Sequence, residues 1–269
     1  MSITVAVAQF TTGTDKESNR KLVTEAVHSA AESGAELVIT PESSMYADPE
    51  QRSEPREYAE PLDGEFTGCL TELAADAGIA VLAGFTELLP GRSRASNTLV
   101  AIGSGGERLG VYRKLHLYDA FGYRESERIE PAEHAEPLVF GLGGLRVGAM
   151  TCYDLRFPEM ARSLTDAGAN AIAVPAAWVA GPAKEEHWSV LARARAIENT
   201  SYVLASGQTG PFCTGQSMIV DPMGSVLAGA GEQPGIALAR LHAERVERVR
   251  ATNPSLANRR FAVIPAPHT

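Results

Sequence analysis

The sequence has few of the features that mark secreted or membrane-spanning proteins. Its 269 residues include only three cysteines, Cys69, Cys152 and Cys213, which are odd in number and far apart. This usage argues against a disulfide framework and for a reducing compartment. No apolar run approaches the roughly 20 residues that a membrane helix needs. The first ten residues lack the basic segment and cleavage site of a signal peptide and have the pattern of a strand. A cytoplasmic protein without a membrane partner is therefore expected.

Positive charge is also in short supply. Lys and Arg number 24 against 33 Asp and Glu, which gives a formal net charge of −9, and no basic stripe is present. Nucleic acid is therefore not an expected partner. The six histidines are scattered without the spacing of metal ligands, so no metal site is expected. The apolar content of 44% and charged content of 21% are those of an ordinary globular protein.

The chain does contain an alternation of strand-like and helix-like segments. Apolar runs with strand character are predicted to form strands at 3–9, 36–40, 79–84, 97–102, 108–113, 145–151, 170–175, 202–207, 215–220, 225–228 and 236–240. Helical periodicity or helix end signals predict helices at 16–33, 66–77, 158–167, 185–199 and 242–250. Strands of both kinds separated by helices predict an α/β fold with two sheets packed face to face and helices outside. No linker, repeat or low-complexity tract interrupts residues 1–269, so one domain is predicted.

Three of the predicted strands end in ionisable residues, namely Glu42, Lys114 and Cys152. Strand ends in α/β folds point toward the ligand crevice, so the three side chains could meet there. A carboxylate can accept the thiol proton, an ammonium can lower the thiol pKa and hold an oxyanion, and a thiolate can attack a carbonyl carbon. Cys152 also precedes a helix-like stretch, whose dipole favours the thiolate. Taken singly, Glu42 could be a helix cap, Lys114 a surface charge and Cys152 a buried apolar residue.

The three stretches around these residues resemble the Glu–Lys–Cys signatures of the nitrilase superfamily of carbon–nitrogen hydrolases, in the same order. The matching segments are TPE at 40–42, YRKLHL at 112–117 and TCYDLRFPE at 151–159, supported by ARAIEN at 194–199 and GQSMIVDPMG at 215–224. The resemblance implies a four-layer α-β-β-α sandwich that forms a homodimer or a higher homo-oligomer. It implies Cys152 as nucleophile, Glu42 as general base and Lys114 as stabiliser of the tetrahedral intermediate. The backbone N–H of Tyr153 would be a second oxyanion donor, and no metal or organic cofactor is expected.

The resemblance also implies a second glutamate in the loop after the lysine, six residues before a proline. Glu125 stands six residues before Pro131 and is expected to orient Lys114 and the substrate amide. Glu127, Glu130 and Glu133 crowd the same loop, so a solvated acidic loop is the alternative.

The residues after the cysteine indicate a branch of the superfamily. True nitrilases tend to place tryptophan and glutamate there, whereas Tyr153 and Asp154 resemble the amidase-like branch, which includes ω-amidases and deaminated-glutathione amidases. We therefore expect a thiol amidohydrolase that converts small linear amides to carboxylic acid and ammonia. The alternatives are an N-carbamoyl-amide hydrolase or nitrilase of the same superfamily, a catalytically silent interaction protein and a redox sensor based on Cys152.

Four further residues are candidates for the substrate pocket or its surroundings. Arg156 could bind a substrate carboxylate, which would make the substrate a monoamide of a dicarboxylic acid, or it could form a structural salt bridge. Tyr46 and Trp178 could form walls of the pocket or serve only in packing. His116 lies in a strand-like run two residues after Lys114, so a structural hydrogen bond is expected there rather than acid–base chemistry.

Overall fold

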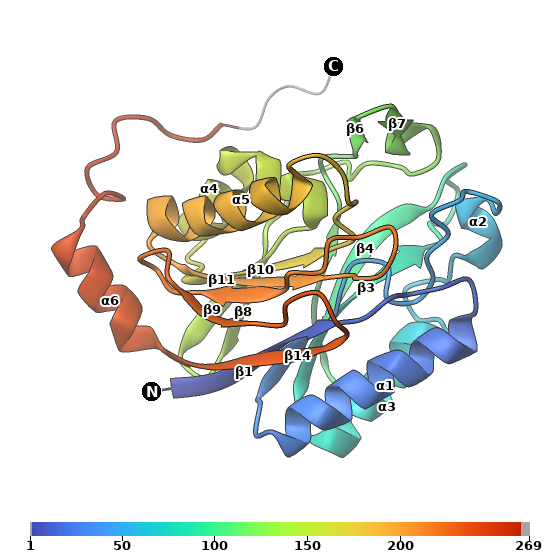
Figure 1. Ribbon diagram of the computed structural model, residues 1–269, viewed down its shortest axis with the longest axis horizontal. Helices are drawn as coiled ribbons and strands as arrows, with labels where there is room; N and C mark the ends of the chain where they lie inside the picture. The colour runs from blue at the N-terminus through green and yellow to red at the C-terminus, as the bar shows by residue number, and fades with distance from the viewer. Residues whose placement is uncertain (1, 265–269) are drawn as a thin grey trace.

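Two six-stranded sheets lie face to face at the centre of the molecule, and helices cover their outer surfaces (Figure 1). This computed structural model describes residues 2–264. The first sheet contains, in spatial order, β14 (Gly235–His242), β1 (Ser2–Gln9), β2 (Leu37–Ile39), β3 (Ala80–Glu87), β4 (Ser96–Ile102) and β5 (Arg108–Arg113). The second contains β13 (Val226–Gly229), β12 (Met218–Val220), β11 (Tyr202–Gly207), β10 (Ala171–Ala176), β9 (Leu145–Ala149) and β8 (Leu138–Leu142).

Both sheets are parallel at the centre and antiparallel toward their edges. Strands β1, β2 and β3 pair in parallel, as do β9, β10 and β11. The outer strands pair antiparallel, and β4 and β5 form the hairpin predicted from the sequence. The carboxyl ends of the parallel strands, where Glu42 and Cys152 follow β2 and β9, therefore carry two of the predicted site residues.

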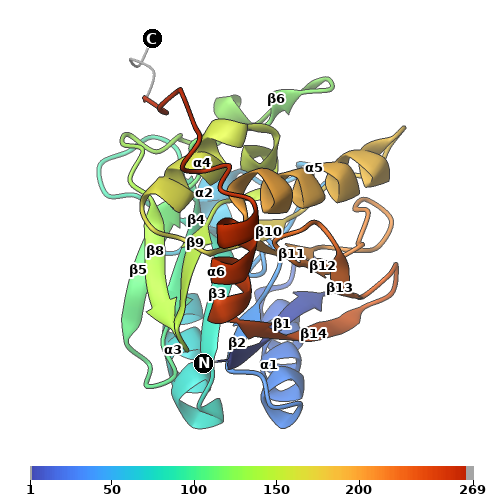
Figure 2. The same cartoon turned by 90° about the vertical axis from the view of Figure 1, so that its left-hand side faces the viewer.

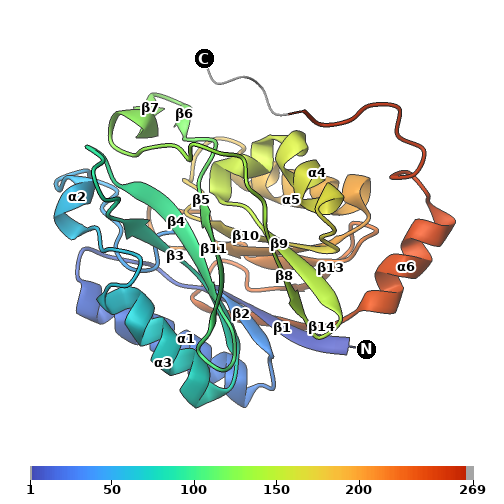
Figure 3. The ribbon, with the colours of Figure 1, turned by 180° about the vertical axis from the view of Figure 1, so that it is seen from behind.

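The helices form the two outer layers. Helices α1 (Lys16–Glu32) and α3 (Glu65–Ala77) cover the first sheet, and α4 (Pro158–Asp166) and α5 (Lys184–Asn199) cover the second (Figure 2). The short α2 (Pro55–Tyr58) and the hairpin of β6 (Asp119–Ala120) and β7 (Tyr123–Arg124) lie at one end of the molecule. Helix α6 (Ala243–Thr252) lies at the other end (Figure 3). Two 3₁₀ helices, Glu125–Glu127 and Cys152–Arg156, complete the elements.

Side-chain alternation along β1 shows how the layers are held together. Ile3, Val5 and Val7 are fully buried in the core shared by the two sheets. Ala6 and Ala8 point the other way, into the core beneath α1 and α3. Successive strand residues face opposite sides, so a strand covered on both faces is apolar at nearly every position. The four-layer α-β-β-α sandwich expected from the sequence is thereby confirmed.

Most predicted helices and strands are confirmed to within a few residues at each end. The unpredicted elements are α2, the β6–β7 hairpin, β8 and the two 3₁₀ helices, because short segments carry little periodicity. The strand-like run expected around His116 is wrong, since β5 ends at Arg113. Within residues 2–264, no helix has the length and apolar character to span a membrane. That residues 1–269 form one domain stays a prediction, and residues 1 and 265–269 lie outside the described part.

Candidate active site

Glu42 is fixed in a turn that follows β2. Its carboxylate is almost fully buried and accepts three hydrogen bonds at its two oxygens. Oε1 accepts from Asn97 Nδ2 at 2.7 Å and from Lys114 Nζ at 3.0 Å, and Oε2 accepts from the backbone N–H of Ala177 at 2.7 Å. The donors come from both sheets, so the position of Glu42 depends on the packing of the two sheets. A glycine makes the turn possible, because a Cβ at Gly84 would lie 3.0 Å from the Glu42 Cα.

Lys114 follows the last residue of β5 and lies between two carboxylates. Its ammonium donates to Glu42 Oε1 at 3.0 Å and to Glu125 Oε2 at 2.9 Å, and its side chain is 2% exposed. An ammonium has three N–H donors, so these two bonds leave one for a third acceptor. The sequence-based expectation that Glu125 orients Lys114 agrees with this geometry.

Cys152 begins the 3₁₀ helix after β9 in an unusual backbone conformation. Its φ is +46°, which a side chain with a Cβ rarely adopts. Residues held in such conformations cluster at functional sites, where the surrounding structure fixes them. Here Asp154 Oδ2 accepts from the Thr151 N–H at 2.8 Å, and Arg195 donates two bonds to the Leu155 carbonyl, at 3.0 and 2.8 Å. These contacts hold the cysteine at the corner between strand and helix.

The charges of the three residues depend on one another. Burial by itself would raise the pKa of the Glu42 carboxyl, but the Lys114 ammonium and the Ala177 N–H outweigh it, so that pKa lies below the ordinary value. Burial would lower the pKa of Lys114, but Glu125 and Glu42 raise it well above the ordinary value. Burial first, and then the Glu42 carboxylate, raise the pKa of the Cys152 thiol well above the ordinary value.

These pKa directions correct one expectation from the sequence. The free protein does not favour a Cys152 thiolate, because loss of solvation and the nearby Glu42 charge outweigh the Lys114 ammonium. The resting state is a neutral thiol beside an ionised carboxylate. This arrangement is suited to general-base catalysis, since the base is deprotonated and the nucleophile still carries the proton to be transferred.

Asn97 is a site residue that the sequence analysis missed. It lies on β4, is 8% exposed, and donates from Nδ2 to Glu42 Oε1 at 2.7 Å and to Glu125 Oε1 at 3.2 Å. The amide nitrogen therefore bridges the two carboxylates that also bind Lys114. An asparagine at the start of the predicted strand 97–102 was the available signal, but its partners are distant in sequence.

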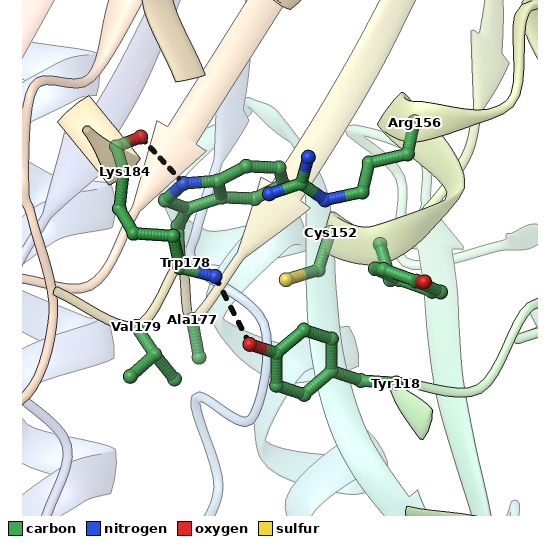
Figure 4. Close-up of a pocket in the computed structure, with 8 residues that line it drawn as sticks. Tyr118, Cys152, Arg156, Ala177, Trp178, Val179 and Lys184 are labelled. Carbon is green, nitrogen blue, oxygen red and sulfur yellow. Dashed lines mark hydrogen bonds between the residues drawn. The ribbon is translucent and has the colours of Figure 1, made fainter. Parts of the chain in front are cut away.

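The thiol of Cys152 points into a small cavity of about 20 Å³ (Figure 4). The cavity is about large enough for one water molecule, so side chains must move before an amide can enter. The lining side chains are partly aromatic and partly cationic, and they come from the 3₁₀ helix at Cys152, the loop after β10, the start of α5 and the loop before β6. They are Tyr118, Cys152, Tyr153, Arg156, Ala177, Trp178, Val179 and Lys184.

Of the candidate pocket residues, some line the cavity and one does not. Trp178 lines the cavity, as one expectation had it, and so do Tyr153 and Arg156. Tyr46 is not among the residues that line this cavity, and its contacts are those of the packing alternative left open for it. Its ring stacks on Tyr58 with centroids 4.0 Å apart, and its hydroxyl lies 3.2 Å from Ser53 Oγ.

The structure also shows the surroundings of Arg156 and His116, for which the sequence left alternatives. No ion pair of Arg156 occurs within residues 2–264, so the structural salt bridge considered for it is wrong. His116 Nδ1 lies 2.7 Å from Asp154 Oδ1 and its ring stacks on Phe157, which agrees with the structural hydrogen bond expected there. Lys184 was not anticipated, because a lysine at the start of a helix is usually solvated.

Comparisons with known proteins agree with this geometry. A family model for carbon–nitrogen hydrolases matches residues 4–251. A deaminated glutathione amidase of Escherichia coli O157:H7 is 41% identical over 259 residues, which cover 96% of this chain and 97% of that protein. A deaminated glutathione amidase of Mus musculus is 38% identical, with 95% and 83% covered.

Among solved structures, Saccharomyces cerevisiae Nit3, a member of branch 10 of the nitrilase superfamily, superposes with a TM-score of 0.86 at 29% identity, with 97% of each chain covered. An amidase from Nesterenkonia sp. AN1, in a form that carries acrylamide added to its active site cysteine, superposes with a TM-score of 0.79 at 28% identity, covering 93% of this chain and 97% of that one.

Proposed function

Because this chain belongs to the carbon–nitrogen hydrolase family, in the amidase-like branch of the nitrilase superfamily, we propose that it hydrolyses small linear amides to a carboxylic acid and ammonia through a thioester on Cys152. The single observation that carries the proposal is the contact set of Glu42. An ionised carboxylate lies beside a neutral thiol, with a buried ammonium bonded to the same carboxylate at 3.0 Å. This is the combination of base, nucleophile and cation that amide cleavage needs.

The first half of the reaction forms the thioester. Glu42 takes the thiol proton as Cys152 Sγ attacks the amide carbon, and the carbonyl oxygen becomes an oxyanion. Protonated Glu42 then gives the proton to the amide nitrogen, the C–N bond breaks, and ammonia leaves. The low pKa of Glu42 keeps it unprotonated at the start of each cycle.

The second half releases the acid. A water molecule attacks the thioester carbon while Glu42 takes one of its protons, and the C–S bond breaks as that proton returns to Cys152 Sγ. The acid leaves and both side chains regain their resting states. The same carboxylate therefore acts as base in both halves of the reaction.

The oxyanion of each tetrahedral intermediate has two proposed donors. Lys114 is held by Glu42 and Glu125, and its third N–H is available for the oxyanion. The backbone N–H of Tyr153, the residue after the nucleophile, is the second donor. Removal of one such donor typically costs about 3–4 kcal/mol of transition-state stabilisation. Glu125 positions Lys114 and accepts from the Tyr118 N–H at 2.7 Å, which ties it to the loop beside the cavity.

The relatives guide the choice of substrates for a first test. Proteins named deaminated glutathione amidase from a bacterium and a mammal align over nearly the whole chain, so deaminated glutathione is the first compound to test, followed by simple aliphatic ω-amides. N-carbamoyl compounds and nitriles belong in the same panel as the alternative substrates. The presence of Tyr153 and Asp154 after the cysteine supports amides over nitriles.

The decisive experiment combines ammonia release with mass spectrometry of the protein. Wild type is expected to release ammonia from at least one amide and to carry the matching acyl mass on Cys152 during turnover. Cys152→Ala is expected to lose about 10⁴-fold or more in kcat, whereas Cys69→Ala, a partly exposed cysteine on α3, retains activity. Equal ammonia release by wild type and Cys152→Ala would exclude the nucleophile, and an inactive but folded wild type would support a silent scaffold.

We also propose that the protein is a cytoplasmic homodimer joined through the layer of α5. Val190 and Ile197 lie seven residues apart on α5 and are about half exposed, and Met223 in the nearby β12–β13 connection and Val226 at the start of β13 are also exposed. Exposed apolar groups of this kind mark association surfaces. Light scattering is expected to give twice the chain mass of 28.5 kDa, and Val190→Glu is expected to reduce it.

A further inference from the structure

The turn that carries Glu42 lies beyond the hydrogen-bonded part of the first sheet. Strand β2 pairs with β1 and β3 over Leu37–Ile39, so Glu42 follows the end of the ladder. Ser43, the next residue, has a φ of +57°, which a residue with a Cβ rarely adopts. A backbone in such a conformation persists only where the surrounding structure fixes it. The proposed general base therefore needs an anchor from outside its own strand.

Gln208 makes a side-chain contact of this kind from the second sheet. It directly follows β11 and is 4% exposed, and its Nε2 donates to the backbone carbonyl of Glu42 at 2.8 Å. Its Oε1 accepts from the backbone N–H of Thr12, in the loop after β1, at 3.3 Å. One buried amide thus links the end of β11, the turn after β2 and the loop after β1. Buried backbone groups need partners of this kind, because water cannot replace them.

The backbone of Gln208 supports the other end of Glu42. Its N–H donates to the Ala176 carbonyl at 2.9 Å, and its carbonyl accepts from the Gly215 N–H at 3.0 Å. Ala177, which follows Ala176, donates its own N–H to Glu42 Oε2 at 2.7 Å. Gln208 therefore contacts the carbonyl of Glu42 directly and supports a donor to the Glu42 carboxylate through one neighbour.

These contacts cross between the two sheets, which is what the reaction requires. Glu42, Asn97 and Lys114 belong to segments of the first sheet, whereas Cys152 follows β9 of the second. Hydrogen bonds among the first three residues cannot align the carboxylate with the thiol. The side chain of Gln208 reaches Glu42 from the sheet that carries the nucleophile, and it thereby sets the distance over which the thiol proton moves.

We propose that Gln208 is a positioning residue for the proposed amidase reaction, whose side-chain amide holds the Glu42 backbone so that the carboxylate stays within reach of the Cys152 proton. This inference rests on the proposed function and adds to it a residue that does not line the cavity beside Cys152. A displacement of about 1 Å between reacting groups can cost about 100-fold in rate, so one hydrogen bond at this position can control kcat.

The substitution Gln208→Met tests the role of the side chain. It removes the amide, nearly preserves its shape and leaves the backbone bonds of residue 208 in place. We expect kcat to fall by roughly 10-fold to 100-fold. We expect KM to change little, because Gln208 does not line the cavity. An unchanged kcat in Gln208→Met would overturn the proposal.

The substitution Gln208→Glu separates the hydrogen bond from the shape of the side chain. A glutamate at this position can donate to the Glu42 carbonyl only when it is protonated. Burial and the Glu42 charge are expected to raise the pKa of the new carboxyl, whereas Lys114 and the Ala177 N–H hold the pKa of Glu42 low. The activity of Gln208→Glu relative to wild type is therefore expected to be low at alkaline pH and to rise as the pH falls. Full activity of Gln208→Glu at alkaline pH would contradict the proposal.

Gln9→Met is the matched control. Gln9 is also a buried glutamine that links the sheets, since its Nε2 donates to two carbonyls between β13 and β14, at 2.9 and 2.8 Å, and its Oε1 accepts from the Ser217 N–H at 2.8 Å. These partners lie outside the Glu42 turn. Gln9→Met is expected to lower Tm at least as much as Gln208→Met, because it removes more hydrogen bonds, and yet to keep its kcat. Equal losses of kcat in the two variants would show that Gln208 has only a structural role.

The thiol of Cys152 gives a measurement that needs no substrate. The Glu42 charge helps to raise the pKa of this thiol, so a carboxylate that moves away lets the thiol ionise at a lower pH. The ultraviolet difference between Gln208→Met and its Cys152→Ala counterpart is expected to show thiolate at a lower pH than in wild type, whereas Gln9→Met is expected to match wild type.

This measurement separates a failure of the positioning role from a failure of the amidase function. If wild type hydrolyses no amide but the thiolate of Gln208→Met appears at a lower pH, the proposed reaction is wrong and the positioning of Glu42 by Gln208 stands. If wild type hydrolyses amides but neither kcat nor the thiol titration responds to Gln208→Met, the role of Gln208 is wrong and the amidase function stands.

Discussion

The Tyr112 hydroxyl donates a hydrogen bond to Asp154 Oδ2 at 2.6 Å, and this contact joins the two halves of the catalytic centre. Tyr112 lies on β5 two residues before Lys114, and Asp154 lies two residues after Cys152 in the other half of the fold. Burial and the Asp154 charge raise the pKa of Tyr112 well above its ordinary value, so the phenol keeps its proton and remains a donor. The hydrogen bond between Tyr112 and Asp154 therefore fixes the position of Lys114 relative to Cys152.

Replacement of this hydroxyl tests the link. Tyr112→Phe is expected to lower the free energy of unfolding by about 1–2 kcal/mol, since Asp154 loses one of its donors. It is also expected to lower kcat more than it raises KM, because the bond positions catalytic groups and does not face the cavity. Chemical denaturation and steady-state kinetics measure the two effects. Tyr46→Phe removes a hydroxyl outside the cavity lining and serves as the control; an equal effect on kcat would contradict the prediction.

The raised pKa of Cys152 can be observed directly. The ultraviolet difference between wild type and Cys152→Ala is expected to show thiolate only above the ordinary thiol pKa of about 8.5. Glu42→Gln removes the negative charge that helps to raise this pKa, so thiolate is expected at lower pH in that variant while amidase activity is lost. A thiolate signal at neutral pH in wild type would show that Lys114 dominates the electrostatics instead.

The low pKa of Glu42 sets the acid limit of activity. The carboxylate is the active form, and its pKa lies below the ordinary value of 4.5, so kcat/KM is expected to persist to a lower pH than an ordinary glutamate would allow. Asn97→Ala removes a donor to this carboxylate, which raises its pKa and moves the acid limb upward. A loss of roughly 10-fold to 100-fold in kcat is expected as well. Asn258→Ala, on an exposed C-terminal turn, is the control; an unmoved acid limb would count against the role of Asn97.

The variant Gly84→Ala tests whether the close approach of the Gly84 backbone to the Glu42 turn positions the general base. A Cβ at this residue would lie 3.0 Å from both the Glu42 Cα and the Ser43 N, so Gly84→Ala must displace the turn that carries Glu42. A destabilisation of about 1–3 kcal/mol and a large loss of kcat are expected. Gly141→Ala, in β8 with no atom within 4 Å of its added Cβ, is the matched control. Thermal unfolding and kinetics that are alike in both variants would refute the steric explanation.

Much of the fold could be predicted because its elements are long and periodic. Residues of β1 and α1 show strand and helix patterns that local geometry dictates, and both are found where expected. The hairpin of β6 and β7 and the 3₁₀ helix at Cys152 were not predicted, because two-residue strands and single turns depend on contacts from elsewhere in the chain. Phe121 lies in the turn between β6 and β7. Its ring contacts the Lys184 ammonium, which is distant in sequence, so no local pattern predicts the contact.

By itself, the sequence determined that an acid, an ammonium and a thiol each follow an apolar strand, and their order along the chain resembles one family of hydrolases. Only the tertiary structure decided how these groups are charged and what surrounds them. Asn97 joins the two carboxylates, Asp154 connects the halves of the centre, and Lys184 faces the cavity beside Arg156. Proton affinity depends on burial and on neighbours in space. For that reason the thiolate expected at a strand-to-helix corner gives way to a neutral thiol beside an ionised glutamate.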